Sequence, residues 1–324
     1  MLAARGRWSG ALVVVTAASL FGMLGTLSRF AYDGGLTPFA WVAWRAAIGA
    51  AALWVVIASR RGIRSSLDGL RSAAPAARRW LALAVLAGAF LNLAIFVAFE
   101  RTTIALALLG FYTYPAMVAA ASGLLGHERL DVVRRVALLL ALGGMVAVVA
   151  GGLAPGTVTV DALGIGLALV AAACQTTFVV ASRGYASIRT EEAMGSILVG
   201  SAAIAVVLSA IVDGPPALVR PLGDPGLLAL LAFVGLFAAA LPSFLFLTGI
   251  RVLGPVRAGI LMLFEPVVGV TLAAAVLGEG VTPLQAAGGA TILLAAALVQ
   301  RRTAVAGGGR TLVDVPVAPA PGGP

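Results

Sequence analysis

The chain has 324 residues, of which 61% are hydrophobic and 11% are charged, whereas soluble domains carry about 25% charged residues. A soluble fold of this size would lack the polar side chains needed to cover its surface, so the composition excludes an ordinary globular protein and favours a bundle embedded in a bilayer. The formal net charge of +9 comes from short arginine runs between apolar segments, a pattern typical of membrane-protein loops, and we expect no nucleic-acid partner.

Ten apolar stretches each approach the length that a helix needs to cross about 30 Å of hydrocarbon. They are residues 10–30, 37–58, 80–99, 104–125, 133–153, 163–181, 193–212, 227–248, 256–277 and 282–299. Residues 1–9 precede the first stretch. Residues 303–324 are rich in Gly, Pro and Ala and have no apolar period, which predicts a disordered tail. The sequence therefore predicts an all-α integral membrane protein with ten transmembrane helices.

The arginine distribution predicts how the helices are oriented. With a cytoplasmic N-terminus and ten alternating helices, 18 of the 22 basic residues lie in cytoplasmic segments, three lie outside, and Arg45 remains inside a helix. All 22 are Arg and none is Lys, which we interpret as GC-rich coding and hence a bacterial source. We expect a multi-pass protein of the bacterial inner membrane with both termini, including the tail, in the cytoplasm.

The two halves of the chain resemble each other. Pro115 and Pro266 each lie inside an apolar stretch, and each is followed thirteen residues later by a glutamate, Glu128 or Glu279. The two repeats are residues 10–153 and 163–300. Each repeat holds five helices, and because five is odd the second copy must enter the membrane upside down. Inverted repeats are the architecture of many secondary transporters and permit alternating access.

These segments resemble the EamA type of the drug/metabolite transporter superfamily over residues 10–300. The resemblance rests on Phe21-Gly22 through Arg29, Pro38 with Arg45, Pro115…Glu128, Glu265-Pro266…Glu279, Gly143-Gly144 and Gly288-Gly289. It implies two inverted five-helix repeats around a central cavity that moves small organic solutes, such as amino acids, nucleosides, drugs or other metabolites, often outward. Gln175 stands where an aromatic residue is common, and Gly126-His127-Glu128 departs from the usual Leu-Gly-Glu, so the substrate stays open.

Two charged residues lie deep in predicted spans, where a charge costs roughly 2.5–3.5 kcal/mol. Arg45 would meet either an anionic substrate group or a structural partner on a neighbouring helix. Glu265 would either line a cavity and exchange a proton, or form a fixed pair with Arg45 or with backbone that Pro266 leaves free.

Other polar residues at mid-depth are candidates for solute contact or for bonds between helices, and three prolines are candidates for shaping the cavity or forming hinges. The predicted substrate pathway comprises Arg45, Asn92, Tyr112, Tyr114, Gln175, Ser243 and Glu265. The predicted cavity-shaping or hinge residues are Pro115, Pro242 and Pro266. Glu128 and Glu279 are expected to cap helices or pair with arginines rather than to gate the pathway.

The sequence favours a secondary carrier over two alternatives, a membrane-embedded enzyme acting on lipid or a lipid-linked group and a non-transporting partner or sensor. With one cysteine, Cys174, and one histidine, His127, we expect no catalytic residues, no metal and no other cofactor. A phosphate-binding G-x-x-x-x-G-K-[ST] motif is also missing. The expected partners are a small solute and the lipid bilayer, and a homodimer stays an open alternative.

Overall fold

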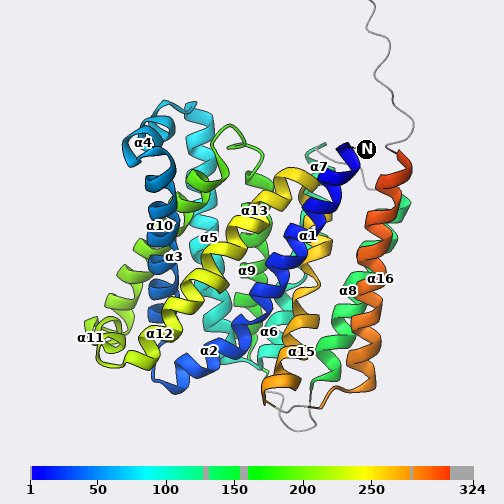
Figure 1. The fold of residues 1–324 in the computed structure, drawn as a ribbon. Coiled ribbons are helices and arrows are strands. Elements are labelled where there is room, and N and C mark those ends of the chain that lie inside the picture. Colours follow the sequence, from blue (N-terminus) through cyan, green and yellow to red (C-terminus); the bar gives the residue numbers. More distant parts are fainter. Residues whose placement is uncertain (1, 127–130, 154–159, 278–279, 307–324) are drawn as a thin grey trace, which may run out of the picture.

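The computed structural model describes residues 2–126, 131–153, 160–277 and 280–306, and its regular elements within these ranges are helices (Figure 1). The first half contains α1 (Leu2–Gly22), α2 (Leu24–Asp33), α3 (Pro38–Arg61), α4 (Ile63–Ser72), α5 (Pro75–Arg101), α6 (Ile104–Phe111), α7 (Tyr114–Leu124) and α8 (Val132–Gly151). The second half contains α9 (Ala162–Ala181), α10 (Thr190–Val212), α11 (Pro215–Val219), η1 (Arg220–Gly223), α12 (Pro225–Val234), η2 (Gly235–Ala240), α13 (Leu241–Leu253), α14 (Pro255–Met262), α15 (Glu265–Leu277) and α16 (Pro283–Ala306).

The predicted fold class is confirmed. In the described part of the chain, nine helical segments are long and apolar enough to cross a membrane, and Pro283–Val299 of α16 adds a tenth, shorter apolar helix. Helix α16 continues to Ala306, so the first four residues of the predicted tail are helical. The rest of that tail, together with His127, Glu128 and Glu279, lies outside the described residues.

The two repeats run in opposite directions. Helix α1 descends from the end of the bundle that holds the N-terminus, whereas α9, its counterpart, ascends from the other end (Figure 1). Equivalent helices of the two repeats make equivalent contacts across the bundle. Helix α5 of the first repeat packs on α9 of the second, and α13 of the second repeat packs on α1 of the first. Helices α3 and α10 are equivalent to each other and pack together, and α8 and α16 do the same.

The three predicted proline positions have two different structural outcomes. A proline lacks an N–H and its ring clashes with the carbonyl four residues earlier. Helix α6 ends at Phe111, four residues before Pro115, and α14 ends at Met262, four residues before Pro266. Pro242 does not break its helix, because the chain widens instead into the π-helical segment η2 just before it. The membrane segment from α12 to α13 is therefore continuous, whereas α6–α7 and α14–α15 are interrupted helices.

Three short elements, α4, α11 and η1, occupy segments predicted as loops. Helix α4 follows α3 after Gly62, whose φ of 80° makes the sharp turn that glycine accepts readily. Ile63, Leu67 and Leu70 recur at helical spacing among polar residues, so α4 is a short amphipathic helix. At the other end of the bundle, α11 and η1 connect α10 to α12. Sequence reasoning missed all three elements because each is too short to cross a membrane, and α4 is also too polar.

Small residues allow the closest helix crossings. A Cβ atom added to Gly144 of α8 would lie 2.7 Å from the carbonyl oxygen of Gly288 on α16. A Cβ added to Gly22, at the end of α1, would lie 2.8 Å from the carbonyl oxygen of Glu265. Glycine thus brings backbones together at the pairing of α8 with α16 and beside the break of α14–α15.

Candidate functional site

A cavity of about 440 Å³ lies between the two repeats. All seven residues predicted for the substrate pathway line it, as does Pro266. Pro115 and Pro242 are buried and are not among its lining residues. Polar residues from α3, α5, α7, α9, α13, α15 and the break between α6 and α7 therefore converge on one space, although sequence reasoning placed them only by depth.

Arg45 and Asn92 form one polar wall. Arg45 is 5% exposed, and its guanidinium donates a hydrogen bond to Oδ1 of Asn92, whose Nδ2 donates to the carbonyl of Gly88 at 2.8 Å. The guanidinium also lies over the ring of Phe96, 5.0 Å from its centre, in a cation–π contact. The Nε atom of Arg45 has no hydrogen-bond partner among the described residues, which leaves a donor available to a bound solute.

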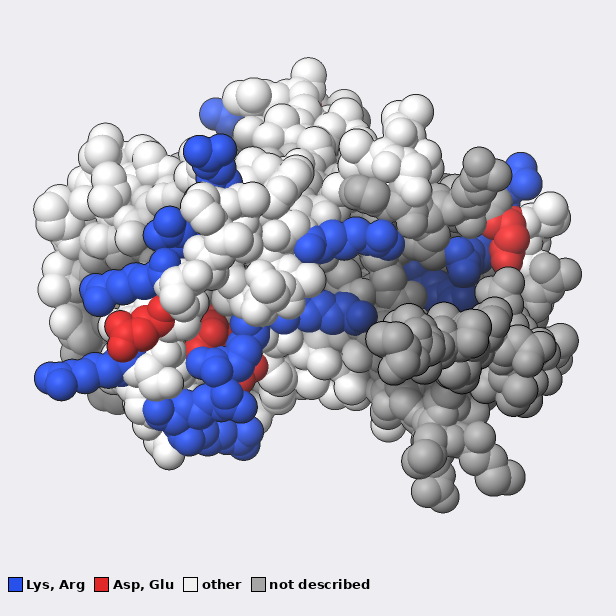
Figure 2. Space-filling view, turned by 90° about the horizontal axis from the view of Figure 1, so that it is seen from above, with Lys and Arg blue, Asp and Glu red and all other residues white. Residues whose placement is uncertain are grey.

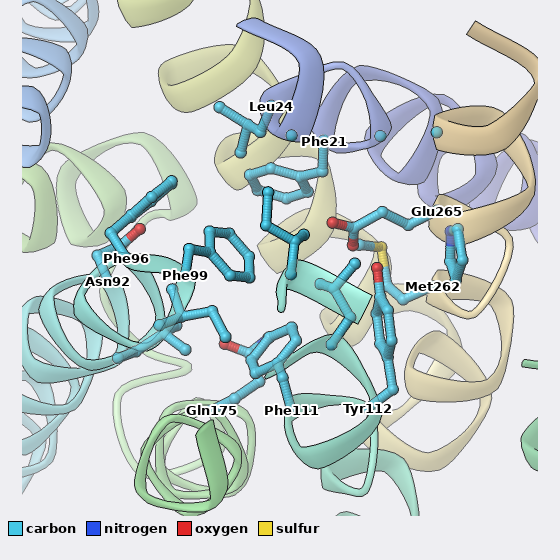
Figure 3. A pocket seen from close by; sticks show the side chains of 18 of the residues that line it. Phe21, Leu24, Asn92, Phe96, Phe99, Phe111, Tyr112, Gln175, Met262 and Glu265 are labelled. Atoms are coloured by element: carbon cyan, nitrogen blue, oxygen red, sulfur yellow. The ribbon is translucent and has the colours of Figure 1, made fainter. Parts of the chain in front are cut away.

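Glu265 and Tyr112 form a second polar group. The Tyr112 hydroxyl donates a hydrogen bond to the Glu265 carboxylate, and Tyr114 lies close enough to interact with it electrostatically. In Figure 3 the Tyr112 and Glu265 side chains point toward each other beside Met262, whereas Asn92 and Phe96 lie on the other side of the cavity. The site therefore presents a guanidinium and a carboxylate on facing walls.

The hypothesis of a fixed Arg45–Glu265 pair is wrong. Among the described residues no ion pair joins the two side chains, and the hydrogen-bond partner of Arg45 is Asn92. The physical reason is position: Arg45 faces α5, while Glu265 begins α15 at the break of its helix and faces Tyr112. Each charge is satisfied by a neutral polar neighbour, so each can still meet a charged group of a solute.

The rest of the lining is largely apolar, although it also includes polar side chains such as Gln175 and Ser243. Its apolar part was not predicted. Phe21, Phe99 and Phe111 fill the space between the two polar groups, and Met262 lies beside Glu265 (Figure 3). No sequence signal marks these residues, because most positions in a membrane helix are apolar whether they face lipid, a neighbouring helix or a cavity.

The cavity reaches one end of the bundle. Its lining includes Gly152 and Leu153 after α8 and Gly280 and Val281 before α16, all at the end away from the N-terminus. Toward the N-terminal end the lining residues stop within helices. The cavity therefore opens to the end of the bundle away from the N-terminus.

The loop between α9 and α10 lies at the N-terminal end of the bundle and contacts α13. Arg251 of α13 donates to the carbonyl of Ile188 at 2.8 Å and to the Thr190 hydroxyl at 2.9 Å, and its guanidinium lies 5.8 Å from the centre of the Tyr185 ring. Burial raises the pKa of Tyr185 above its usual value, so its phenol stays neutral. Arg189 also pairs with the buried Glu192. These contacts tie the loop to α13 and to the start of α10.

No group of three or more His, Cys, Asp or Glu side chains that could hold a metal ion occurs in the part of the chain that the structure describes. Cys174 is a free, partly buried thiol in α9.

The model of the EamA-like transporter family matches residues 8–150 and 162–301. The chain belongs to this family. It is thus a multi-pass protein of a membrane-transporter family, a member of the drug/metabolite transporter superfamily, and the two matched segments are its two repeats. A solved crystal structure resembles it with a TM-score of 0.72 at 22% identity, covering 90% of this chain and 97% of the other. At that identity the likeness shows the fold alone. No functionally curated protein matches the chain.

Proposed function

We propose that this EamA-like protein is a secondary carrier that exports a small organic solute, such as an amino acid, another metabolite or a drug, by alternating access. One observation carries the proposal. A single cavity at the meeting point of two interrupted helices holds Arg45 and Glu265 on facing walls and opens to one end of the bundle. Broken helices at the interface of inverted repeats are where transporters commonly hold their substrates.

The two polar walls suggest separate roles. Arg45 would bind an anionic group of the solute, such as a carboxylate, because its guanidinium is always charged and has a free donor. Glu265 would bind a cationic group or carry a proton, because Tyr112 rather than an arginine is its partner. The aromatic side chains between them would contact the apolar part of the solute.

The membrane setting follows from the arginine bias. We place the protein in a bacterial inner membrane with both termini in the cytoplasm, so that the open end of the cavity faces outward. A loaded cavity in this state would release its solute to the outside. A homodimer is a further proposal that no contact in a single chain supports.

An enzyme acting on lipid is the weaker interpretation. Such chemistry needs clustered acid and base groups or a metal near the bilayer surface. Among the described residues that line the cavity, Glu265 is the one carboxylate, and it lies deep in the bundle. This arrangement suits binding better than proton transfer to a substrate at the interface.

The test begins with thermal shift on the purified protein, using amino acids, nucleosides, polyamines and lipophilic cations, because a ligand that binds the folded state raises Tm. We expect a carboxylate-bearing solute to raise Tm. Arg45→Ala should weaken its binding by roughly ten- to a hundredfold, since a charge-assisted hydrogen bond contributes about 1.5–3 kcal/mol. Counterflow of that solute in proteoliposomes should be lost in parallel.

Arg64→Ala is the matched control, because Arg64 is exposed on α4 and does not line the cavity. Arg45→Lys keeps the charge and serves if the alanine variant fails to fold. An unchanged Tm shift in folded Arg45→Ala would refute the assigned role of Arg45. Chemical turnover of a solute in detergent, where no compartments exist, would favour the enzyme.

A further inference from the structure

A second cavity, of about 500 Å³, opens on the side of the bundle between α3, α4, α10, η2 and α13. We call it the lateral groove. Its wall is apolar and includes exposed side chains, among them Val56 at 43%, Phe237 at 44% and Leu241 at 39% exposed. It is separate from the central cavity, because the two share no lining residue.

Charged side chains occur at one end of the lateral groove. Arg60 and Arg61, the last residues of α3, line it together with Glu191 in the first turn of α10. Both arginines are exposed, and neither forms an ion pair with any described residue. The end of α3 leads into α4 at the top of the bundle in Figure 1. On this face arginines gather with a few acidic side chains between them (Figure 2).

Two further features favour an anion at this end. Ser66 of α4 lines the groove, is 0% exposed, and its hydroxyl has no hydrogen-bond partner among the described residues. Helix α4 starts directly after Gly62, and no side chain caps its N-terminus. The positive end of a ten-residue helix thus adjoins Arg60 and Arg61.

We propose that the lateral groove binds a zwitterionic glycerophospholipid of the adjoining leaflet, with the headgroup phosphate between Arg60 and Arg61 and the headgroup ammonium toward Glu191. The acyl chain would lie along the wall that Phe237 and Leu241 form. Arginine side chains match phosphate oxygens with paired hydrogen bonds. Basic pockets between membrane helices at the bilayer surface are typical lipid-headgroup sites.

The charges and the apolar wall together favour a phospholipid over the other simple occupants. A soluble anion would leave the apolar wall uncovered. A second copy docked symmetrically through this groove would bring four arginines and two glutamates to one end of the interface, an excess of like charge that disfavours it. A phospholipid satisfies the headgroup end and covers the wall at the same time, and it would span α3 of the first repeat and η2 of the second.

The experiment uses the full-length protein, delipidated in detergent and examined by native mass spectrometry. The probes are dioleoyl phosphatidylethanolamine, dioleoyl phosphatidylglycerol and dioleoyl glycerol, which lacks a phosphate. We expect the phosphatidylethanolamine to bind more tightly than the phosphatidylglycerol, and dioleoyl glycerol to bind least. Arg60→Gln/Arg61→Gln should weaken phospholipid binding by about tenfold or more, and Glu191→Gln should remove the preference for phosphatidylethanolamine over phosphatidylglycerol.

The matched control is Arg78→Gln/Arg79→Gln, which removes two adjacent exposed arginines of α5 that do not line the groove. This control should bind lipid as the parent does, and thermal melting checks that both double variants are folded. The proposal would be overturned if both double variants lost phospholipid binding equally, or if Arg60→Gln/Arg61→Gln lost none. It would also be overturned if the parent formed a dimer that Arg60→Gln/Arg61→Gln abolished and the control variant did not. Equal binding of the two phospholipids by the parent would overturn the assignment of Glu191.

Discussion

The two interrupted helices, α6–α7 and α14–α15, share a backbone design but differ in one side chain. In both, the second residue of the helix that follows the break is a proline. Within each break, a backbone N–H donates a hydrogen bond to the carbonyl three residues earlier in the chain. Thr113 N–H bonds to the carbonyl of Gly110 at 3.3 Å, and Phe264 N–H bonds to that of Leu261 at 3.2 Å. The residue before the proline is Tyr114 in one repeat and Glu265 in the other.

The neighbouring helices also differ at the equivalent point. The Thr176 hydroxyl of α9 lies 3.5 Å from the carbonyl oxygen of Tyr114, whereas α1 brings Gly22 against the carbonyl of Glu265. The comparison teaches that proline sets the backbone of both breaks, because it removes the same hydrogen bond in each. The side chain before the proline then decides which break carries charge.

The strongest way to test this comparison is to neutralise the charged break. We expect Glu265→Gln to lower transport by about tenfold or more and to make the remaining transport independent of a pH gradient, because the amide cannot exchange a proton or pair with a cationic group. Transport would be measured as solute flux in proteoliposomes with and without an imposed pH gradient.

Tyr114→Phe is the matched variant at the equivalent position. It removes a hydroxyl but no charge, so transport should fall by about threefold or less. Loss of transport as large in Tyr114→Phe as in Glu265→Gln would show that charge does not distinguish the two breaks.

A second test enlarges the glycine beside the charged break. Gly22→Ala should destabilise the protein by roughly 1–3 kcal/mol, because the added methyl group would lie 2.8 Å from the carbonyl oxygen of Glu265 and a backbone must move. Thermal melting measures the effect. Gly25→Ala is the control, since a Cβ at Gly25 meets nothing within 4 Å. Equal melting of the two variants would contradict the close approach of α1 to α15.

The smallest expected effect comes from the prolines themselves. Pro266→Ala restores an N–H that can bond to the carbonyl of Met262, and the resulting shift moves Glu265, which lines the cavity. Pro115→Ala moves Tyr114 instead. We expect the solute Kd to rise about threefold more for Pro266→Ala than for Pro115→Ala, measured by thermal shift. A larger rise in the solute Kd for Pro115→Ala than for Pro266→Ala would show that the break at Tyr114, and not the break at Glu265, positions the group that binds the solute.

Several features followed from the sequence because they depend on local chemistry. A stretch of about 20 apolar residues is enough to predict a span. The thirteen-residue spacing after Pro115 and Pro266 was enough to predict the repeat. An arginine or a glutamate inside a span is costly, which is why Arg45 and Glu265 stood out as candidates before any packing was known.

Tertiary structure alone decided how these residues relate to one another. Sequence placed Arg45, Asn92 and Glu265 at similar depth but could not say which way each helix faces, and rotation about the helix axis is set by packing. Packing alone decided that Arg45 forms its hydrogen bond with Asn92 and that Glu265 accepts one from Tyr112. Only packing distinguished the breaks at Pro115 and Pro266 from the π-helical segment before Pro242.

The apolar lining of the cavity shows most clearly what the sequence could not predict. Phe21, Phe99 and Phe111 face the cavity, whereas Phe233 and Phe237 are 41% and 44% exposed on the outside of the bundle. In a soluble protein the outward-facing positions would contact water and would mostly carry polar residues, so the sequence could distinguish them from positions that face the interior. In a bilayer both surroundings are compatible with apolar side chains, so the sequence determined the spans, the repeat and the costly charges, and packing alone decided which apolar residues form the site.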